Sequence, residues 1–408
     1  MMPPRRVVIT GIGVVSALGR DRESFWSALS TGRTGIAPLT AVDASGFHFT
    51  QAAEVRDFDP SPIIEPKLVK QLDRFAQFAL VAAHQAVADA AIDTRSLGGR
   101  GGVIAGTTVG GQDSQDEGFT ALYREGRNRL HPATIVKIMP NAAVSQLTIS
   151  FGITGPSYTV CAACASSNYA IGQAFWLIRN RVLDMALAGG SDAPFSFGNL
   201  KAWDALRVVS PTSCRPFSAG RDGMILGEGG GILVLEALES AQRRGAKIYA
   251  ELVGFGMSSD ASHLVHPSAQ GAAQAMLAAL ADAQLAPDQV TYINAHGTGT
   301  TANDVSETSA IRAVFGEHAK KLAVSSTKSM HGHALGAAGA LEAIASVLTI
   351  ERGFIPPTVG YLGPDPACDL DVVPNQGRHG DIEVALSNNF AFGGLNAVLA
   401  FRQWKPRA

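Results

Sequence analysis

Cys164 is the residue of this sequence best suited to covalent chemistry, and it stands among small residues in the stretch 158–178. The stretch begins with β-favouring residues and continues as an apolar helix pattern, which predicts that Cys164 lies at a strand-to-helix turn. At a helix N-terminus, unpaired backbone N–H groups and the positive end of the dipole stabilise a thiolate. Cys164 is therefore a candidate nucleophile; from this residue alone, a buried and inert cysteine is the alternative.

A glycine-rich loop within residues 292–301 carries a second candidate, His296. We expect a strand that ends in this loop, and open α/β sheets place their ligands where strands end. Thr298 and Thr300 offer two hydroxyls at the same place. The glycines between them leave room for a substrate to approach the backbone.

Lys328 and His333 lie in another run of small residues, 324–342. A lysine in such apolar surroundings is costly unless it is paired. Glu342, on the helix that follows, is a suitable partner. The alternative here is a structural ion pair accompanied by surface histidines.

Residues 388–396 place two phenylalanines, Phe390 and Phe392, beside two glycines. This pattern indicates a sharp loop with a movable aromatic ring and exposed backbone N–H groups. Such a loop can supply an oxyanion donor or act as a gate. A plain hairpin turn is the alternative.

Composition narrows the classes of function. The chain has 408 residues, of which 46% are hydrophobic, and its net charge of -2 gives no basic footprint for nucleic acid. Its four cysteines make no disulfide framework, and the single Cys-x-x-Cys lacks a second pair for zinc, so we expect no metal and a reducing, cytoplasmic location. No apolar run is long enough to span a bilayer, so no membrane association is expected.

An internal repeat divides the chain. Residues 7–16 resemble residues 250–259, and residues 160–172 lie over residues 324–336 without a gap. Both pairs run in the same order along the chain, which predicts two similar halves divided near residue 250. We expect one half at 1–250, with the cysteine, and the other at 251–408, with both histidines and the lysine.

Short buried strands alternate with helical patterns in both halves. This alternation predicts a layered α/β fold with largely parallel sheets. Residues 112–140 are charged and irregular, and we expect them to form an insertion or cap on the first half.

A nucleotide-binding oxidoreductase is a weaker alternative, prompted by Gly11 and Gly13. Ser16 stands where the third glycine of Gly-x-Gly-x-x-Gly would be. No tyrosine is followed four residues later by lysine, as a short-chain dehydrogenase would need. Both departures disfavour this class.

The motifs together resemble the β-ketoacyl-[acyl-carrier-protein] synthases of the elongating type II kind, from Arg6 to Phe401. They are Ala-Cys-Ala-Ser-Ser at Cys164, Asn-Ala-His-Gly-Thr-Gly-Thr at His296, Lys-Ser-Met-His-Gly-His ending at His333, and Asn-Phe-Ala-Phe-Gly-Gly. Met-His-Gly-His and Phe-Gly-Gly-Leu-Asn look closest to a branch that includes nodulation protein E. The resemblance implies a thiolase-like fold of duplicated halves in five layers, α-β-α-β-α, working as a homodimer without a cofactor of its own.

The resemblance also implies the role of each residue. Cys164 would take an acyl group from the phosphopantetheine thiol of an acyl carrier protein, and His296 and His333 would polarise the malonyl thioester while carbon dioxide leaves. Backbone N–H groups of Cys164 and Phe392 would hold the oxyanion. Lys328, with Glu342, would set the local field.

Further implied contacts concern the substrate and its carrier. Thr298 and Thr300 would touch the pantetheine arm, Val109 would line the acyl pocket, and Phe390 would contact substrate. An acidic carrier protein would dock on basic side chains, for which the candidates are Lys67, Lys70 and Arg207.

Some positions depart from the family pattern. Ala391 stands where glycine is usual in the gate, and Leu395 and Val265 stand where threonine is common. A starter-type synthase would have asparagine at His333, and a thiolase would have a second cysteine. Two alternatives stay open: a ketosynthase subunit of a type II polyketide or aryl-polyene system, paired with a chain-length factor, and a subunit that only binds.

Overall fold

A single mixed sheet of ten strands forms the frame of the computed structural model, which describes residues 4–406. The strands follow the order β10-β9-β13-β14-β8-β1-β7-β6-β4-β5. Their bounds are β1 (Val7–Ser16), β4 (Gly101–Gly106), β5 (Ser157–Val160), β6 (Met185–Asp192), β7 (Gly229–Ala237), β8 (Ala250–Ser259), β9 (Tyr292–Asn294), β10 (Ala323–Ser325), β13 (Val384–Ala391) and β14 (Leu395–Gln403). Two short pairs lie outside it: β2 (Ala37–Pro38) with β3 (Gln51–Ala52), and β11 (Phe354–Ile355) with β12 (Arg378–His379).

The strand order reads the same outward from its centre. β1, β7, β6, β4 and β5 on one side correspond to β8, β14, β13, β9 and β10 on the other. β1 and β8, which are the first pair of repeated segments, meet only where Val7, Val8 and Ile9 pair with Leu252, Glu251 and Ala250. The duplicated halves expected for the fold are confirmed, and the domain boundary near residue 250 stays a prediction.

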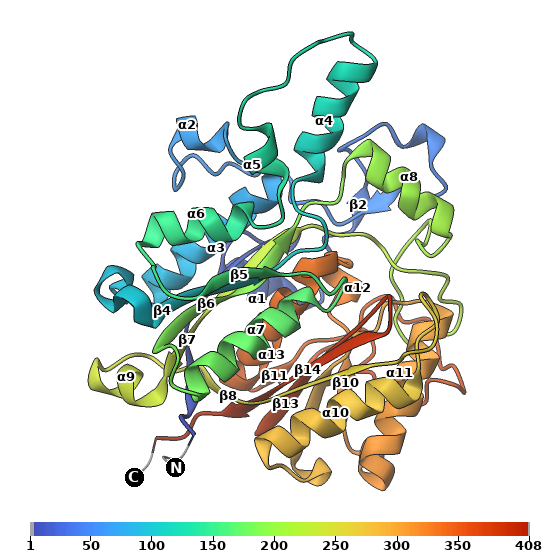
Figure 1. The fold of residues 1–408 in the computed structure, drawn as a ribbon. Helices are drawn as coiled ribbons and strands as arrows, with labels where there is room; N and C mark the ends of the chain where they lie inside the picture. Colours follow the sequence, from blue (N-terminus) through green and yellow to red (C-terminus); the bar gives the residue numbers. More distant parts are fainter. Residues whose placement is uncertain (1–3, 407–408) are drawn as a thin grey trace.

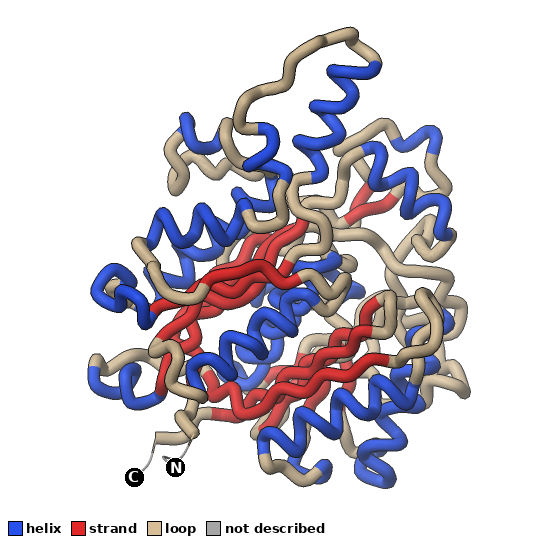
Figure 2. Tube along the Cα trace, in the orientation of Figure 1, coloured by secondary structure: helices blue, strands red, loops and turns tan. Residues whose placement is uncertain are grey.

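Helices cover both faces of each half of the sheet (Figures 1 and 2). α7 (Ser166–Arg179) and α13 (Ala338–Arg352) lie between the halves. α3 (Arg74–Ala90) and α6 (Ala142–Phe151) cover the outer face of the first half. α10 (Ala269–Ala283) covers that of the second, with α11 (Thr301–Phe315) packed on α10. The arrangement is the five-layer α-β-α-β-α stack.

The remaining helices are short or peripheral. They are α1 (Arg22–Thr31), α2 (Pro66–Val69), α4 (Gln112–Tyr123), α5 (Thr134–Ile138), α8 (Phe197–Leu206), α9 (Leu238–Arg243) and α12 (Lys328–His331). In the part of the chain that the structure describes, no single helix has the length and apolarity to cross a membrane; only the bent pair Arg74–Ala90 and Thr94–Arg100 passes, by length and composition alone.

Two expectations about secondary structure are wrong. β4 lies parallel to β5 and β6, and β9 parallel to β10 and β13, but the other neighbours in the large sheet are antiparallel. Only residues 392–394 join β13 to β14, which is too short for the crossover that parallel neighbours need. Residues 112–140 are largely helical, as α4 and α5; neither helix has a buried residue, which explains why no apolar face marked them.

The glycines of β1 serve helix packing. A Cβ added at Gly13 would stand 1.7 Å from the carbonyl oxygen of Ala82 in α3, and Gly11 is as crowded. Gly254 and Gly256 of β8 meet the backbone of α10 in the same way. The repeated Gly-x-Gly therefore lets a helix lie directly on a strand in each half, which accounts for the motif without a nucleotide.

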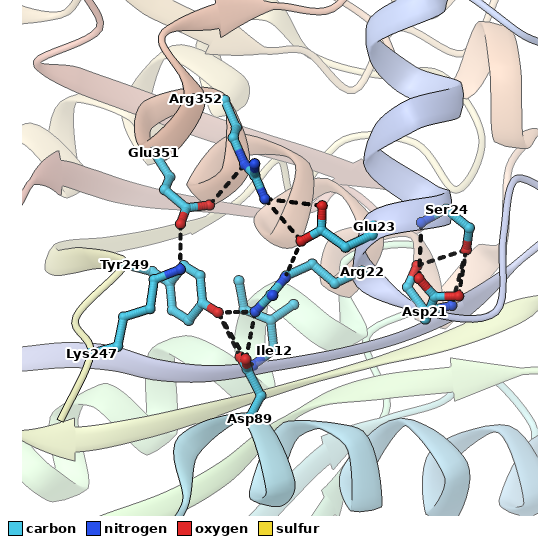
Figure 3. A network of polar contacts seen from close by, with 10 residues as sticks. All are labelled: Ile12, Asp21, Arg22, Glu23, Ser24, Asp89, Lys247, Tyr249, Glu351 and Arg352. Atoms are coloured by element: carbon cyan, nitrogen blue, oxygen red, sulfur yellow. Dashed lines mark hydrogen bonds and ion pairs between the residues drawn. The ribbon is translucent and has the colours of Figure 1, made fainter.

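Asp89 of α3 ties β1 to α1 and to the segment that precedes β8, within the first half and near its junction with the second (Figure 3). It accepts hydrogen bonds from the backbone of Ile12 at 3.0 Å and from the Tyr249 hydroxyl at 2.8 Å, and it pairs with Arg22 at 2.5 Å. β1 leaves β8 after Ile9, so the Ile12 N–H has no strand partner on that side. Burial raises the pKa of Asp89, and Arg22 partly offsets this.

Candidate active site

Cys164 occupies a tight turn between β5 and α7. Ala163 has a φ of 45°, a left-handed conformation that is uncommon for a residue with a side chain. Ser166 holds the turn, because its hydroxyl accepts from the Ala162 N–H at 2.9 Å and donates to the Ala163 carbonyl at 2.7 Å. The turn leaves the cysteine side chain only 6% exposed, two residues before the helix begins.

One cavity of about 100 Å³ brings the predicted residues together. Cys164 from the first half shares it with His296 and His333 from the second. Its other linings include Thr298, Thr300, Phe390, Ala391, Phe392 and Val265. A larger hollow of about 930 Å³, lined largely by α4 and the loops at residues 40–58, contains none of the predicted residues, so chemistry and not size identifies the site.

The charge state of Cys164 differs from the expectation. Burial raises the pKa of the Cys164 thiol to about 11, although Lys328 and the backbone N–H groups of Phe392 and Cys164 act in the opposite direction. Without substrate the sulfur is therefore a thiol at neutral pH, and the predicted standing thiolate is wrong. The same two N–H groups near the sulfur are the pair expected to bind an oxyanion.

His296 is positioned by a carboxylate that the sequence reasoning missed. Glu307 of α11, fully buried, accepts from the backbone N–H of His296 at 2.9 Å and of Gly297 at 2.8 Å. Burial raises the pKa of Glu307 to about 7, and these donors partly offset it. A charged residue on the buried face of the helix after the loop is the signal by which it could have been found.

His333 has a defined tautomer. Its Nδ1 accepts a hydrogen bond from the Leu335 backbone N–H at 3.1 Å, so Nε2 carries the proton of the neutral ring. Burial, and then the charge of Lys328, hold the pKa of both His296 and His333 well below the usual value. Both rings, with centroids 5.4 Å apart, are therefore neutral at pH 7.

Lys328 and Glu342 form a fully buried ion pair. Asn389 donates to the second carboxylate oxygen of Glu342 at 2.9 Å. Burial raises the pKa of Glu342, and Lys328 partly offsets this. Since the lysine does not line the cavity, it acts on the thiol and the imidazoles through its field.

The loop between β13 and β14 closes one side of the cavity. The Phe392 ring stacks on Trp203 of α8, with centroids 6.1 Å apart, and the Gly393 N–H donates to the Leu264 carbonyl at 2.7 Å. Gly393 has a φ of 83°, which favours glycine there. These contacts attach the loop to two separate surface segments.

The substrate contacts implied by the resemblance divide into two groups. The hydroxyls of Thr298 and Thr300 lie 2.8 Å apart in the cavity wall, and the Phe390 ring lies 6.1 Å from that of His296. Val109 does not line this cavity and is 45% exposed. The docking candidates Lys67, Lys70 and Arg207 are exposed.

Among residues 4–406 no group of three or more His, Cys, Asp and Glu side chains could hold a metal ion. The amide and hydroxyl oxygens of β9 and β13 are a separate feature of this region. Asn294 Oδ1, Ser387 Oγ, Asn388 Oδ1 and Asn389 Oδ1 are buried without a hydrogen-bond partner. Asn294 ends β9 and the other three residues lie on the adjacent strand β13, where Ser387 pairs with Asn294.

The comparison with known families decides the identity of this fold and site. The N-terminal domain model of the β-ketoacyl synthases matches residues 4–241, and the C-terminal domain model matches residues 249–362. The chain belongs to the β-ketoacyl synthase family. It is a ketosynthase, an acyltransferase that performs condensation, as the resemblance implied.

Individual relatives agree over almost the whole length. Nodulation protein E of Rhizobium sp. (strain N33) is 49% identical, covering 98% of this chain and 99% of the relative. The 3-oxoacyl-[acyl-carrier-protein] synthase 2 of Staphylococcus aureus (strain COL) is 42% identical, covering 99% of this chain and all of the relative. The first carries the name of the branch that the motifs indicated, and the second carries the name of the wider synthase family.

Solved structures confirm the thiolase-like fold of ketosynthases. The ishigamide ketosynthase/chain length factor has a TM-score of 0.94 at 38% identity, covering 98% of this chain and 100% of that chain. A type II polyketide ketosynthase, solved in complex with its acyl-carrier protein, has a TM-score of 0.90 at 34% identity, with the same coverage.

Removing the buried ion pair should slow the reaction of Cys164 with iodoacetamide. We expect Lys328→Met combined with Glu342→Gln, which leaves no unpaired charge, to slow alkylation at fixed neutral pH by roughly threefold to tenfold. The reason is that Lys328 lowers the pKa of the thiol. Mass spectrometry of the labelled peptide measures the rate. Exposed Cys161 is an internal control whose labelling should not change, and an unaltered rate at Cys164 would contradict the role given to Lys328.

Proposed function

We propose that this ketosynthase joins an acyl group held on Cys164 to malonyl-carrier protein by decarboxylative Claisen condensation, in the elongation of a fatty acid or related acyl chain. The products are β-ketoacyl-carrier protein, carbon dioxide and free carrier. The observation that carries the proposal is the shared cavity of Cys164, His296 and His333. Substrates bring their own phosphopantetheine, so we propose that no further cofactor takes part.

Acyl transfer comes first. The Cys164 sulfur attacks the acyl carbonyl carbon, the bond to the carrier sulfur breaks, and the carrier thiol leaves with the proton that Cys164 loses. The oxyanion that forms between these events is held by the backbone N–H groups of Cys164 and Phe392, which lie near the sulfur. Because burial raises the pKa of the thiol to about 11, Cys164 must lose its proton for the attack to proceed, and the departing carrier sulfur takes one up.

Decarboxylation and condensation follow. The Nε2–H of His333, with His296, donates toward the malonyl thioester oxygen while the bond to the carboxylate breaks and carbon dioxide leaves. The electron pair passes into the enolate, whose carbon attacks the Cys164 thioester. The new carbon–carbon bond forms, the Cys164 thiolate is expelled, and it takes a proton from solvent.

The domain organisation expected from the repeat is part of this proposal. We divide the chain into a nucleophile half at 1–250 and a histidine half at 251–408, with residues 112–140 inserted in the first. In support, the match to the N-terminal family model ends at residue 241, and the match to the C-terminal model begins at residue 249. We also propose a reducing, cytoplasmic location, which suits four cysteines that are all free.

The carrier protein is proposed to dock on Lys67 and Lys70 of the α2 region and on Arg207, which ends α8. α8 also carries Trp203, the ring that stacks on Phe392. Docking at this place would therefore bear on the loop that closes the cavity. A type II polyketide relative was solved with an acyl-carrier protein, which supports this class of partner.

Reversing these charges should weaken the use of carrier-bound substrate. For the triple variant Lys67→Glu, Lys70→Glu and Arg207→Glu we expect KM for acyl-carrier protein to rise about tenfold or more at low salt, because complementary charge is replaced by repulsion. Steady-state kinetics measure it, with Lys320→Glu plus Lys321→Glu as the matched control. An unchanged KM would reject this docking face.

A homodimer is the proposed assembly. β5 ends the large sheet and its outer edge has no partner strand in the described chain, which invites pairing with another chain. Exposed apolar side chains surround that edge: Val109, Ile135, Val136, Met139 and Tyr158. Pro140, just after α5, accepts from the Thr159 hydroxyl of β5 at 3.3 Å, which places α5 beside it. The alternative partner is a chain-length factor, as in the ishigamide relative.

Charge placed on this edge should separate the subunits. The chain alone is expected to sediment as a dimer, and Ile135→Asp with Val136→Asp as a monomer, because an apolar contact becomes charged. Leu277→Asp, which alters an exposed side chain of α10, is the control. A wild-type monomer that gains partner and activity only with a cysteine-less homologue would overturn the homodimer and favour the polyketide or aryl-polyene assignment.

Loss of the nucleophile tests the proposed function itself. Cys164→Ala should abolish condensation of purified carrier-protein substrates, since no thioester can form, and mass spectrometry of the carrier products measures it. His333→Ala should leave acylation of Cys164 partly intact and block decarboxylation. Condensation by Cys164→Ala would reject the assignment, and failure of wild-type Cys164 to react with iodoacetamide would favour a subunit that only binds.

A further inference from the structure

Asp192, the last residue of β6, is a buried carboxylate that the mechanism above does not use. It is 1% exposed, and no ion pair involves it among the residues that the structure describes. One oxygen accepts from the Thr107 hydroxyl at 2.6 Å, and the other accepts from the Thr108 hydroxyl at 2.8 Å and the Gly336 N–H at 2.6 Å. The Thr108 N–H lies 3.1 Å and 3.2 Å from the two oxygens.

One set of these partners belongs to the loop after β4, residues 107–111, which carries Val109. Both threonine hydroxyls at the start of this loop are turned to Asp192, and the Thr107 oxygen also accepts from the Gly110 N–H at 3.3 Å. The path of the backbone on either side of Val109 is thus fixed through Asp192. Val109 is the residue that the family resemblance assigns to the acyl pocket.

The remaining partner belongs to the turn that orients His333. Gly336 donates to Asp192, and the residue before it, Leu335, donates to His333 Nδ1. The contact is close: a Cβ at Gly336 would stand 2.6 Å from the Asp192 carboxylate and 2.7 Å from the Thr108 nitrogen. A shift of Gly336 must therefore move the N–H that sets the tautomer of His333.

We propose that Asp192 is a positioning residue that joins the Val109 loop to His333, so that the selection of acyl-chain length and the decarboxylation of the extender depend on one carboxylate. The inference rests on the proposed function. A carboxylate suits the place because it accepts from two hydroxyls and two backbone N–H groups at once, whereas an amide keeps one accepting oxygen and turns its NH₂ toward the remaining partners. Removing the bonds to Gly336 frees the His333 turn, and removing those to the threonines frees the acyl loop.

Asp192 also acts on Cys164 through its charge, and loss of this charge should affect the alkylation of Cys164 in the opposite direction from decarboxylation. It is one of the groups that raise the pKa of the Cys164 thiol. Neutralising it should therefore leave alkylation of Cys164 as fast as in the wild type, or faster, while decarboxylation becomes slower. General loosening of the fold would slow both reactions together.

The test is Asp192→Asn in the full chain. We expect malonyl-carrier protein decarboxylation, measured without acyl donor, to fall about tenfold to a hundredfold, since small displacements of catalytic groups have effects of that size. Iodoacetamide labelling of Cys164 should be no slower. With a series of acyl-carrier proteins, the chain-length profile of condensation should shift. Three results for this variant would each overturn the proposal: a decarboxylation rate equal to that of the wild type, an unchanged chain-length profile, or a parallel loss of labelling and decarboxylation.

Two further variants keep the test decisive. Glu236→Gln is the control, because Glu236 of β7 is another buried carboxylate, bound to Thr10 and Arg244. This variant should change none of the three measurements. If Asp192→Asn does not fold, Thr108→Val removes one donor at constant shape and should alter the profile and decarboxylation a fewfold in the same directions; no change would overturn the proposal. A wild-type chain that fails to condense would instead refute the proposed function.

Discussion

The buried ion pair of Lys328 and Glu342 is the interaction on which the rest of the site depends. Burying two charges is unfavourable by several kcal/mol per ion unless geometry and hydrogen bonds compensate. Here Lys328 pairs with one oxygen of Glu342, and Asn389 donates a hydrogen bond to the other. Neither residue of the pair lines the cavity, yet the lysine charge reaches the thiol of Cys164 and both imidazoles. A stabilising apolar replacement was available in principle, so the retained charge points to chemistry.

Close packing of the two halves brings that charge within reach of the nucleophile. Within the first half, a Cβ at Gly106, the end of β4, would stand 2.5 Å from the backbone of Ser166, where the helix after Cys164 begins, and the contact between the halves is as close. A Cβ at Gly339, in the first turn of α13, would stand 2.5 Å from the Asn168 side chain of α7. The middle layer is therefore packed backbone against side chain. Because the cysteine comes from one half and the histidines from the other, this packing sets their separation.

The sequence predicted what depends on local pattern and missed what depends on tertiary contact. Cys164, His296, His333 and Lys328 stood out because each lies in a run of small residues. Asp192 was missed because it accepts from a backbone N–H 144 residues further along the chain, and Glu307 because its bond from the His296 N–H forms only when the loop folds back on α11. The thiolate expectation failed for a related reason: a helix terminus is visible in a sequence, whereas the burial that opposes ionisation is not.

The arrangement of charge explains why the site can use neutral groups. The substrate-free cavity holds a thiol and two neutral imidazoles, while the buried carboxylates around it, Asp192 and Glu307 among them, are occupied by backbone donors. The negative charge that enters with malonyl-carrier protein is thus not met by a free protein carboxylate. In the mechanism we propose, that charge moves to the enolate oxygen when carbon dioxide leaves, and the His333 Nε2–H is the donor placed to receive it. An imidazolium would bind the malonyl carboxylate as well as the enolate, whereas a neutral donor favours the charge where it develops.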